Sequence, residues 1–262
     1  MTEIFTQYQT SDLLRKRPVL GLLGGQAVTD NKPFTELIAK YVDHNMLAAV
    51  AREHRRGRRL LIGTTNLDAQ RPVIWNMGHL ANSGHPGALA LFRKILLASA
   101  SIPGIFPPVY IDVSAGGRKA QEMHVDGGTT DVVFLVPTQV SFTDMDKLLK
   151  IKPTRHLFVI WNGRISPEWK PVKPSTLKIA ARAISTVLKN HGISDLQRLY
   201  AESRRDQTDY NLAAIPGEFV DTSKESFDKT YMNKLYNFAH RLAASGYQWM
   251  KVPPGFKARA SR

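Results

Sequence analysis

Residues 122–134 read Glu122-Met-His-Val-Asp126-Gly-Gly-Thr-Thr-Asp-Val-Val-Phe134, a short strand-forming run that stops at a carboxylate followed by two glycines. The alternation in Gln121–Val125 predicts a strand with Asp126 at its C-terminal end. In open α/β sheets, catalytic groups lie beyond the C-terminal ends of strands. Gly127 and Gly128 carry no side chain, so a second element can approach the carboxylate closely. Asp126 is therefore the first candidate for a functional residue.

Asp126 has two interpretations on local sequence alone. It could take the proton of a serine nucleophile, provided that the hydroxyl lies within hydrogen-bond reach. It could equally cap a turn, because Asp-Gly is among the commonest turn dipeptides, and the local sequence favours this simpler reading. No serine of the 262 residues has glycine at both −2 and +2, so a Gly-x-Ser-x-Gly nucleophile motif is absent.

Other side chains have simpler explanations than catalysis. Ser99 and Ser101 lie in an apolar segment beside Pro103 and lack the exposed turn of a nucleophile. Ser83 belongs to a loop, and we expect the imidazole of His124 to be packed or hydrogen-bonded in the core. Asn66 and Asp68 end a predicted strand, where turn capping is the favoured role.

Strand and helix patterns alternate along the chain, which predicts an α/β layer fold with a mostly parallel sheet. The turn between the third and fourth strands falls at Gly116–Gly117, and His191–Gly192 is expected to stop a helix. Gly21–Gly25 lacks the Lys-Ser/Thr ending of a phosphate loop, so a turn is favoured there. We expect strands at 59–66, 73–77, 109–113, 121–125, 157–161 and 210–215, and helices at 33–42, 47–54, 88–100, 177–188, 196–203 and 227–246.

Composition limits the classes of protein that fit. There are no cysteines, which excludes disulfides, thiolate metal sites and a cysteine nucleophile. The histidines and carboxylates show no metal-ligand spacing, and no cofactor motif occurs, so we expect neither metal nor cofactor. The sequence shows no signal peptide and no transmembrane run, and a cytoplasmic or membrane-peripheral protein is the default expectation.

The formal net charge of +14 favours attraction to anionic surfaces. The charge is spread along the chain, with its densest run at Arg52–Arg59 and without interleaved aromatic residues. We therefore expect no specific nucleic-acid binding. Peripheral association with anionic membranes is the sharper expectation. The oligomeric state is open.

Three ordered blocks resemble the patatin-like phospholipase family. They are Gly63-Thr-Thr-Asn-Leu-Asp68 with Pro72-Val-Ile-Trp75, then Leu97-Ala-Ser-Ala-Ser-Ile-Pro-Gly-Ile-Phe-Pro-Pro108, then His124-Val-Asp-Gly-Gly128. The likeness is greatest to a bacterial branch and extends from about residue 15 to residue 256. It implies a three-layer α/β/α fold in which residues 1–262 form a single patatin-like domain that is incomplete at its N-terminus.

Family members are similar in using a Ser-Asp dyad to hydrolyse acyl esters of lipids. The resemblance transfers the Asp-Gly-Gly motif to Asp126, Gly127 and Gly128, with Asp126 as the proton acceptor. The family's Gly-rich oxyanion loop and its Gly-x-Ser-x-Gly motif are both missing here. We therefore expect an N-terminally truncated serine carboxylic-ester hydrolase, inactive alone. The alternative is a non-catalytic pseudo-hydrolase or a basic protein that binds anionic lipid.

Overall fold

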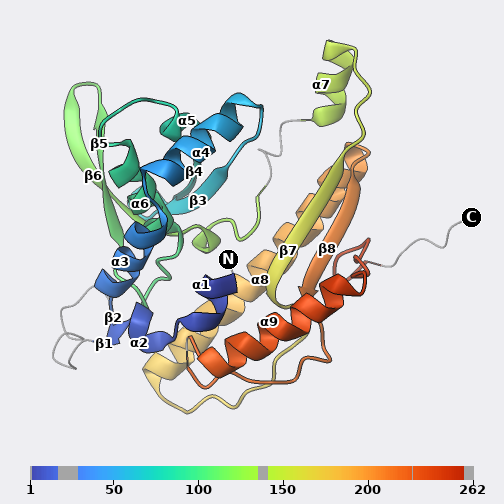
Figure 1. Ribbon diagram of the computed structural model, residues 1–262. Helices are drawn as coiled ribbons and strands as arrows, with labels where there is room; N and C mark the ends of the chain where they lie inside the picture. Colours follow the sequence, from blue (N-terminus) through green and yellow to red (C-terminus); the bar gives the residue numbers. More distant parts are fainter. Residues whose placement is uncertain (1, 17–28, 135–140, 226, 257–262) are drawn as a thin grey trace, which may run out of the picture. The chain divides into compact units, whose positions relative to one another are not determined.

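The computed structural model describes residues 2–16, 29–134, 141–225 and 227–256, which form a mixed α/β chain (Figure 1). The predicted turn at Gly21–Gly25 lies outside these residues. The chain folds into two compact units. Unit 1 comprises Met1–Asp131 with Glu225–Lys229, and unit 2 comprises Val132–Lys224 with Thr230–Arg262.

Unit 1 contains most of the short elements of the chain. Its elements are α1 (Thr2–Gln7), α2 (Thr10–Leu13), β1 (Arg15–Lys16), β2 (Thr29–Asp30), α3 (Lys32–Tyr41), α4 (His44–Arg55), β3 (Leu61–Asn66), β4 (Arg71–Asn76), α5 (Met77–Ala81), α6 (Ala88–Ser99), β5 (Val109–Ala115), β6 (Arg118–Asp126) and the 3-10 helix η2 (Gly127–Thr129).

The main sheet of unit 1 has the strand order β4-β3-β6-β5, and every neighbouring pair is antiparallel. Gly116 and Gly117 join β5 to β6 with φ values of 56° and 76°, a backbone conformation that glycine adopts without strain. The core lies between this sheet and α6, where the fully buried Ile95 belongs to the same apolar cluster as Val109 and Ile111.

The prediction of a mostly parallel sheet is not confirmed. Among the described strands only β7 and β8 pair in parallel. The reason is the length of the connections: β3 and β4 are joined by residues 67–70, and β5 and β6 by two glycines. Such short links permit only antiparallel hairpins, whereas a parallel pair needs a crossover of a dozen or more residues.

Unit 2 is built around its pair of parallel strands. Its elements are α7 (Phe142–Leu149), β7 (His156–Arg164), α8 (Thr176–Arg205), β8 (Asp209–Ile215) and α9 (Lys229–Ala244), of which α9 starts with the last residue of unit 1. The C-terminal half of α8 packs on the strands, with Leu196 and Leu199 against Val159 and Leu212.

Two helix predictions were wrong in their limits. Helix α8 does not stop at His191–Gly192 but continues to Arg205. A Cβ atom at Gly192 would lie 2.0 Å from the Trp161 ring, so this glycine permits close packing instead of ending the helix. Phe227 was expected on the last helix, but it precedes α9 and belongs to an apolar cluster of unit 1. Within the described residues, no helix has the length and apolar character needed to span a membrane.

Candidate functional site

Asp126 is the last residue of β6, as the sequence predicted. It lies opposite Thr64 in the register of β3 and β6. Its backbone N–H donates to the carbonyl of Ser101 over 2.9 Å, which ties the end of β6 to the segment that follows α6. The position of the carboxylate is therefore set by backbone pairing on two sides.

The two glycines after Asp126 have separate roles. A Cβ atom at Gly127 would lie 2.6 Å from the carbonyl oxygen of Gly63, so only glycine fits against β3 here. The N–H of Gly128 donates to the Oδ1 atom of Asp126 over 2.7 Å. Asp126 thus caps the short helix η2, as the turn interpretation predicts, and the same bond fixes the direction of its carboxylate.

The carboxylate of Asp126 is partly buried, and this burial raises its pKa above the ordinary value of 3.8. The hydrogen bond from Gly128 acts in the opposite direction but does not compensate for the lost hydration. Among the described residues no cation forms an ion pair with Asp126, and its Oδ2 atom accepts no hydrogen bond. One carboxylate oxygen is therefore anchored, and the other is available to accept a proton.

His124 is fully buried and hydrogen-bonded, which confirms the prediction of a core imidazole. Its Nε2 atom lies 3.2 Å from Oε2 of Glu122, and its Nδ1 atom lies 2.9 Å from the hydroxyl of Thr64. That hydroxyl also accepts the Nε1–H of Trp75 over 2.8 Å. Since both ring nitrogens of His124 are engaged, the imidazole is a structural link and has no free nitrogen for acid–base work.

Ser101 and Ser83, two serines considered from the sequence, form structural hydrogen bonds. Ser101 is fully buried and donates its hydroxyl proton to the carbonyl of Leu97 over 2.8 Å. Ser83 donates to the carbonyl of Leu80 at the end of α5 over 2.8 Å. Ser101 is inaccessible, whereas Ser83 is exposed but lies in the loop after α5 and not at a strand-to-helix turn, as the sequence predicted.

Asn66 has the turn-capping role that the sequence predicted, whereas Asp68 bonds to β6 instead of capping its own turn. Asn66 accepts the N–H of Ala69 through Oδ1, and Asp68 accepts the N–H of Met123 through Oδ2. These bonds hold the turn after β3 against β6.

The sequence analysis missed Thr65. Its hydroxyl donates to the backbone carbonyl of Asp126 over 3.0 Å and lies 2.8 Å from the hydroxyl of Thr130. It therefore links β3 to the backbone of Asp126 before η2 and to the side chain of Thr130 after it. No local signal marks this role, because the partners of Thr65 are more than sixty residues away in the sequence.

Asp126 is thus a partly buried carboxylate at the end of β6, with no ion-pair partner among the described residues. Residues 3–138 match the family model of patatin-like phospholipases, and this range includes Asp126, Gly127 and Gly128. The match covers more than half of the 262 residues, so the chain belongs to the patatin-like phospholipase family, a family of lipid hydrolases. No curated protein matches the chain.

Proposed function

We propose that this chain carries the base of a patatin-like lipid acyl hydrolase, with Asp126 as the proton acceptor. The observation that carries the proposal is the carboxylate itself: one oxygen is held by the N–H of Gly128, and the other has no partner among the described residues. Burial raises the pKa of Asp126, which makes the ionised carboxylate a stronger base. The substrate class proposed is a lipid or another acyl ester.

In the proposed reaction Asp126 activates a serine hydroxyl. The serine proton moves to the free carboxylate oxygen while the serine oxygen bonds to the ester carbonyl carbon. Collapse of the tetrahedral intermediate breaks the ester bond, and the leaving alcohol takes the proton from Asp126. Water then hydrolyses the acyl-serine, with Asp126 again accepting and returning one proton.

The 262 residues contain no Gly-x-Ser-x-Gly motif. We therefore propose that the serine comes from a segment outside these residues and that the chain is inactive alone. A single oxyanion donor typically contributes about 10²–10³ in rate. Without such donors and without the serine, little beyond background hydrolysis is expected.

The patatin-like domain extends, in this proposal, beyond the matched residues 3–138. We propose that residues 1–262 form one patatin-like domain, that the resemblance continues to about residue 256, and that the full fold has three layers. The membership of Glu225–Lys229 in unit 1 supports this extent, because the chain returns to the matched region after nearly a hundred residues.

The experiment is a comparison of two chain lengths. The DNA upstream of the Met1 codon is translated in frame, and both products are assayed on p-nitrophenyl butyrate and phosphatidylcholine. We expect activity only in a longer product that carries Gly-x-Ser-x-Gly. In that product Asp126→Asn should lower kcat by about 10²–10⁴, the usual contribution of a positioned base.

Asp112→Asn is the matched control, since Asp112 is an exposed carboxylate on β5 of the same sheet, and it should keep full activity. Full activity of Asp126→Asn would refute the role of Asp126. Hydrolysis by the 262-residue chain itself would refute its inactivity.

A second candidate is a pseudo-hydrolase that binds anionic lipid without cleaving it. The net charge of +14 and the group of arginines at the end of α4 favour it. Salt-sensitive vesicle binding without ester cleavage by either chain length would support this function over hydrolysis.

A further inference from the structure

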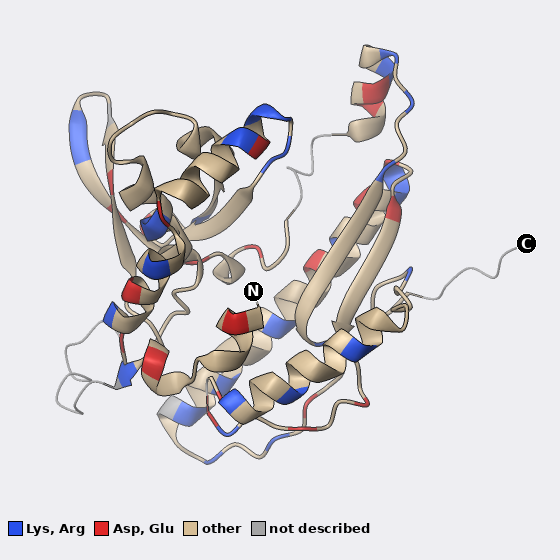
Figure 2. Cartoon of the chain, viewed as in Figure 1, with Lys and Arg blue, Asp and Glu red and all other residues tan. Residues whose placement is uncertain are grey.

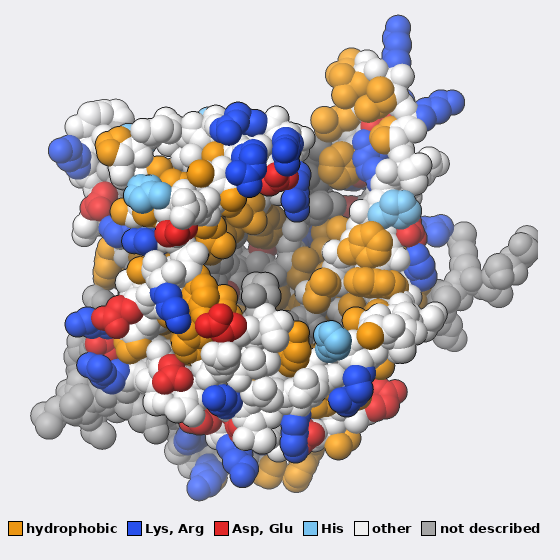
Figure 3. All heavy atoms as spheres, viewed as in Figure 1, with side chains coloured by type: hydrophobic (Ala, Val, Ile, Leu, Met, Phe, Trp, Pro, Cys, Tyr) orange, Lys and Arg blue, Asp and Glu red, His pale blue; other side chains and the backbone are white. Residues whose placement is uncertain are grey.

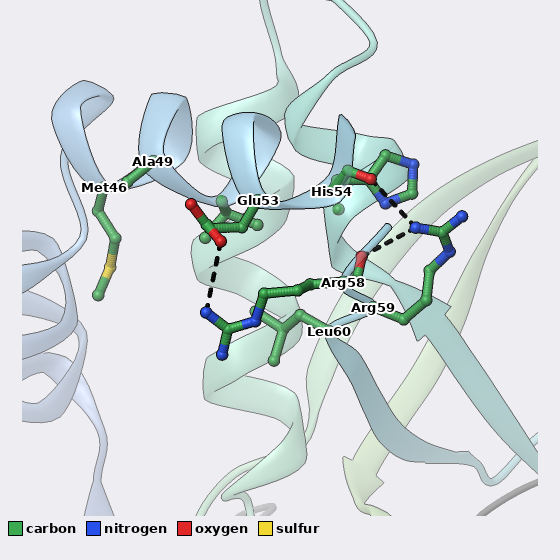
Figure 4. Close-up of a pocket in the computed structure, with 9 residues that line it drawn as sticks. Met46, Ala49, Glu53, His54, Arg58, Arg59 and Leu60 are labelled. Atoms are coloured by element: carbon green, nitrogen blue, oxygen red, sulfur yellow. Dashed lines mark hydrogen bonds and ion pairs between the residues drawn. The ribbon is translucent and has the colours of Figure 1, made fainter. Parts of the chain in front are cut away.

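A pocket in unit 1 combines an apolar lining with arginines. It has a volume of about 330 Å³ and lies between α4 and the residues that lead into β3. Met46, Ala49, Val50 and Leu60 supply apolar side chains, and Arg58 and Arg59 supply guanidinium groups (Figure 4). We call it the arginine pocket.

The charge around the arginine pocket is strongly positive. Five arginines and one glutamate lie between residues 52 and 59, which leaves a net charge of +4 over eight residues. Figure 2 shows these basic residues gathered at the C-terminal end of α4. The one carboxylate of the run, Glu53, is shared by Arg56 at 2.9 Å and Arg58 at 3.4 Å.

Among the described residues, Arg59, which lines the pocket, and Arg55, on α4, have no acidic partner. Within the described residues, the partners to which Arg59 donates are the backbone carbonyls of His54 and Arg58, over 3.1 and 2.9 Å. Arg55 donates to the side-chain oxygen of Asn82. In the described part of the chain neither forms an ion pair. Loss of hydration, and then the positive charges of Arg59 and Arg55, hold the pKa of His54 below its ordinary value. An anion would therefore find uncompensated charge here.

The apolar lining indicates what kind of anion fits. Met46 is 44% exposed and Leu60 is 42% exposed, and Leu61 follows at 38%. Figure 3 shows hydrophobic side chains beside the basic ones on this face. Basic residues around exposed aliphatic side chains are typical of surfaces that bind anionic membranes. Among the described residues, no Phe, Tyr or Trp lines the pocket to stack on bases, which disfavours single-stranded nucleic acid.

We propose that the arginine pocket docks unit 1 on anionic membranes, with Arg58 and Arg59 at phospholipid headgroups and Met46 and Leu60 against the acyl region. The pocket does not include Asp126, and the inference is independent of ester hydrolysis. The arginine pocket is then the surface of unit 1 that contacts the lipid bilayer.

The test is co-sedimentation of the full chain with phosphatidylcholine vesicles, with and without phosphatidylglycerol. Arg58→Glu/Arg59→Glu should lower binding to the anionic vesicles at least tenfold, because each basic side chain near such a surface contributes measurably to binding. Lys170→Glu/Lys173→Glu makes the same change of charge on exposed residues of unit 2 and should lower binding much less. Circular dichroism checks that both variants are folded.

A second substitution tests the apolar contribution. Leu60→Ser keeps every charge and should lower binding to anionic vesicles even in high salt, where surface electrostatics are screened. Equal loss of binding in both charge variants would overturn the proposal, since total charge would then explain the attraction. So would equal binding of the unchanged chain to neutral vesicles. Salt-resistant retention on a DNA column that only Arg58→Glu/Arg59→Glu abolishes would also overturn it in favour of nucleic acid.

Discussion

Asp126 experiences two opposing effects within one turn of the chain. Partial burial removes water from its carboxylate, while the N–H of Gly128 donates to it over 2.7 Å. Burial is the larger effect, so the pKa of Asp126 is raised. A carboxylate that is costly to keep ionised, without a compensating cation among the described residues, is typical of a functional position.

The raised pKa of Asp126 gives a prediction about stability and pH. A carboxyl whose pKa is higher in the folded state than in the unfolded state stabilises the fold while it is protonated. This contribution is complete below the unfolded-state pKa and is lost as pH rises through the folded-state pKa. Asp126→Asn keeps an oxygen that can accept from Gly128 and removes the charge. Its melting temperature should exceed that of the unchanged chain at pH 7, and the difference should vanish below about pH 3.8.

Asp112→Asn is the control of opposite sign. Hydrogen bonding to Gln121 and attraction to Lys94 lower the pKa of Asp112. Its charge is therefore favourable in the fold, and its removal should not raise the melting temperature at pH 7. A melting temperature of Asp126→Asn below that of the unchanged chain at pH 7 would contradict the assignment.

The close approach of Gly127 to β3 gives a second prediction at this scale. The added Cβ of Gly127→Ala would lie 2.6 Å from a backbone oxygen, which cannot move as a side-chain end would. We expect a loss of about 1–3 kcal/mol in the free energy of unfolding, the usual cost of overpacking. Gly217→Ala, where no atom lies within 4 Å of the new Cβ, should be neutral in the same urea titration.

Among the elements of unit 1, the three strands β3, β4 and β6 are joined by side chains as well as by backbone bonds. Thr64 on β3 accepts from Trp75 on β4 and contacts His124 on β6. The carboxylate of Glu122 can only accept, so the Nε2 atom of His124 carries a proton. In the neutral imidazole, Nδ1 then accepts from the Thr64 hydroxyl. The hydroxyl of Thr64 thus forms hydrogen bonds with both the Trp75 indole and the His124 imidazole.

Thr64→Val removes this hydroxyl and keeps the shape of the side chain. It leaves the indole N–H of Trp75 and Nδ1 of His124 without their partner, so the free energy of unfolding should fall by about 1–3 kcal/mol. Thr35→Val makes the same change on the exposed face of α3 and should stay within about 0.5 kcal/mol. Equal denaturation midpoints for the two variants would show that Thr64 does not link the strands.

Strands β3 to β8 and most of the longer helices could be predicted from periodicity, because each pattern is local. The two-residue strands β1 and β2 and the short helices α1, α2, α5 and α7 were not predicted. Alternation in 121–125 and the glycines at 116–117 were sufficient for the β5–β6 hairpin. The relative direction of the strands was not predicted correctly. The prediction of a mostly parallel sheet rested on the alternation of strands and helices along the chain and neglected how short the connections between the strands are. The course of α8 through Gly192 depends on Trp161, thirty-one residues earlier, and no local pattern contains that contact.

For the candidate site, the sequence predicted the carboxylate, its strand end and the need for glycine at 127. It could not predict the partners. The contact of Gly127 with Gly63 and the bonds of Thr65 to Asp126 and Thr130 all join residues about sixty positions apart. Such pairings follow from strand register, which is a property of the sheet as a whole.

On the scale of the whole molecule, unit 1 is discontinuous in sequence. Phe227 packs in a cluster with Leu13, Leu14 and Phe106, and its N–H donates to the hydroxyl of Thr10 over 3.1 Å. A residue outside the matched range 3–138 therefore completes part of the core of unit 1.

Phe227→Ala should destabilise unit 1 at a distance in sequence. Loss of a partly buried ring is expected to cost about 1–2 kcal/mol, less than the deletion of a fully buried one. Hydrogen exchange of peptides that contain Leu13 and Leu14 should become about tenfold faster. Val220→Ala, at a side chain that is 77% exposed, should leave these peptides unchanged. Unaltered exchange in Phe227→Ala would mean that the cluster does not stabilise the N-terminal helices.

The discontinuity has a consequence for how the chain is made. Ninety-three residues, 132 to 224, separate the two segments of unit 1. At about 5–20 residues per second a ribosome needs roughly 5–20 s to translate them. During that interval Leu13 and Leu14 lack the contact that Phe227 supplies in the folded unit. The cluster of Leu13, Leu14 and Phe106 therefore gains the packing of Phe227 only after the segment between the two parts of unit 1 has been translated.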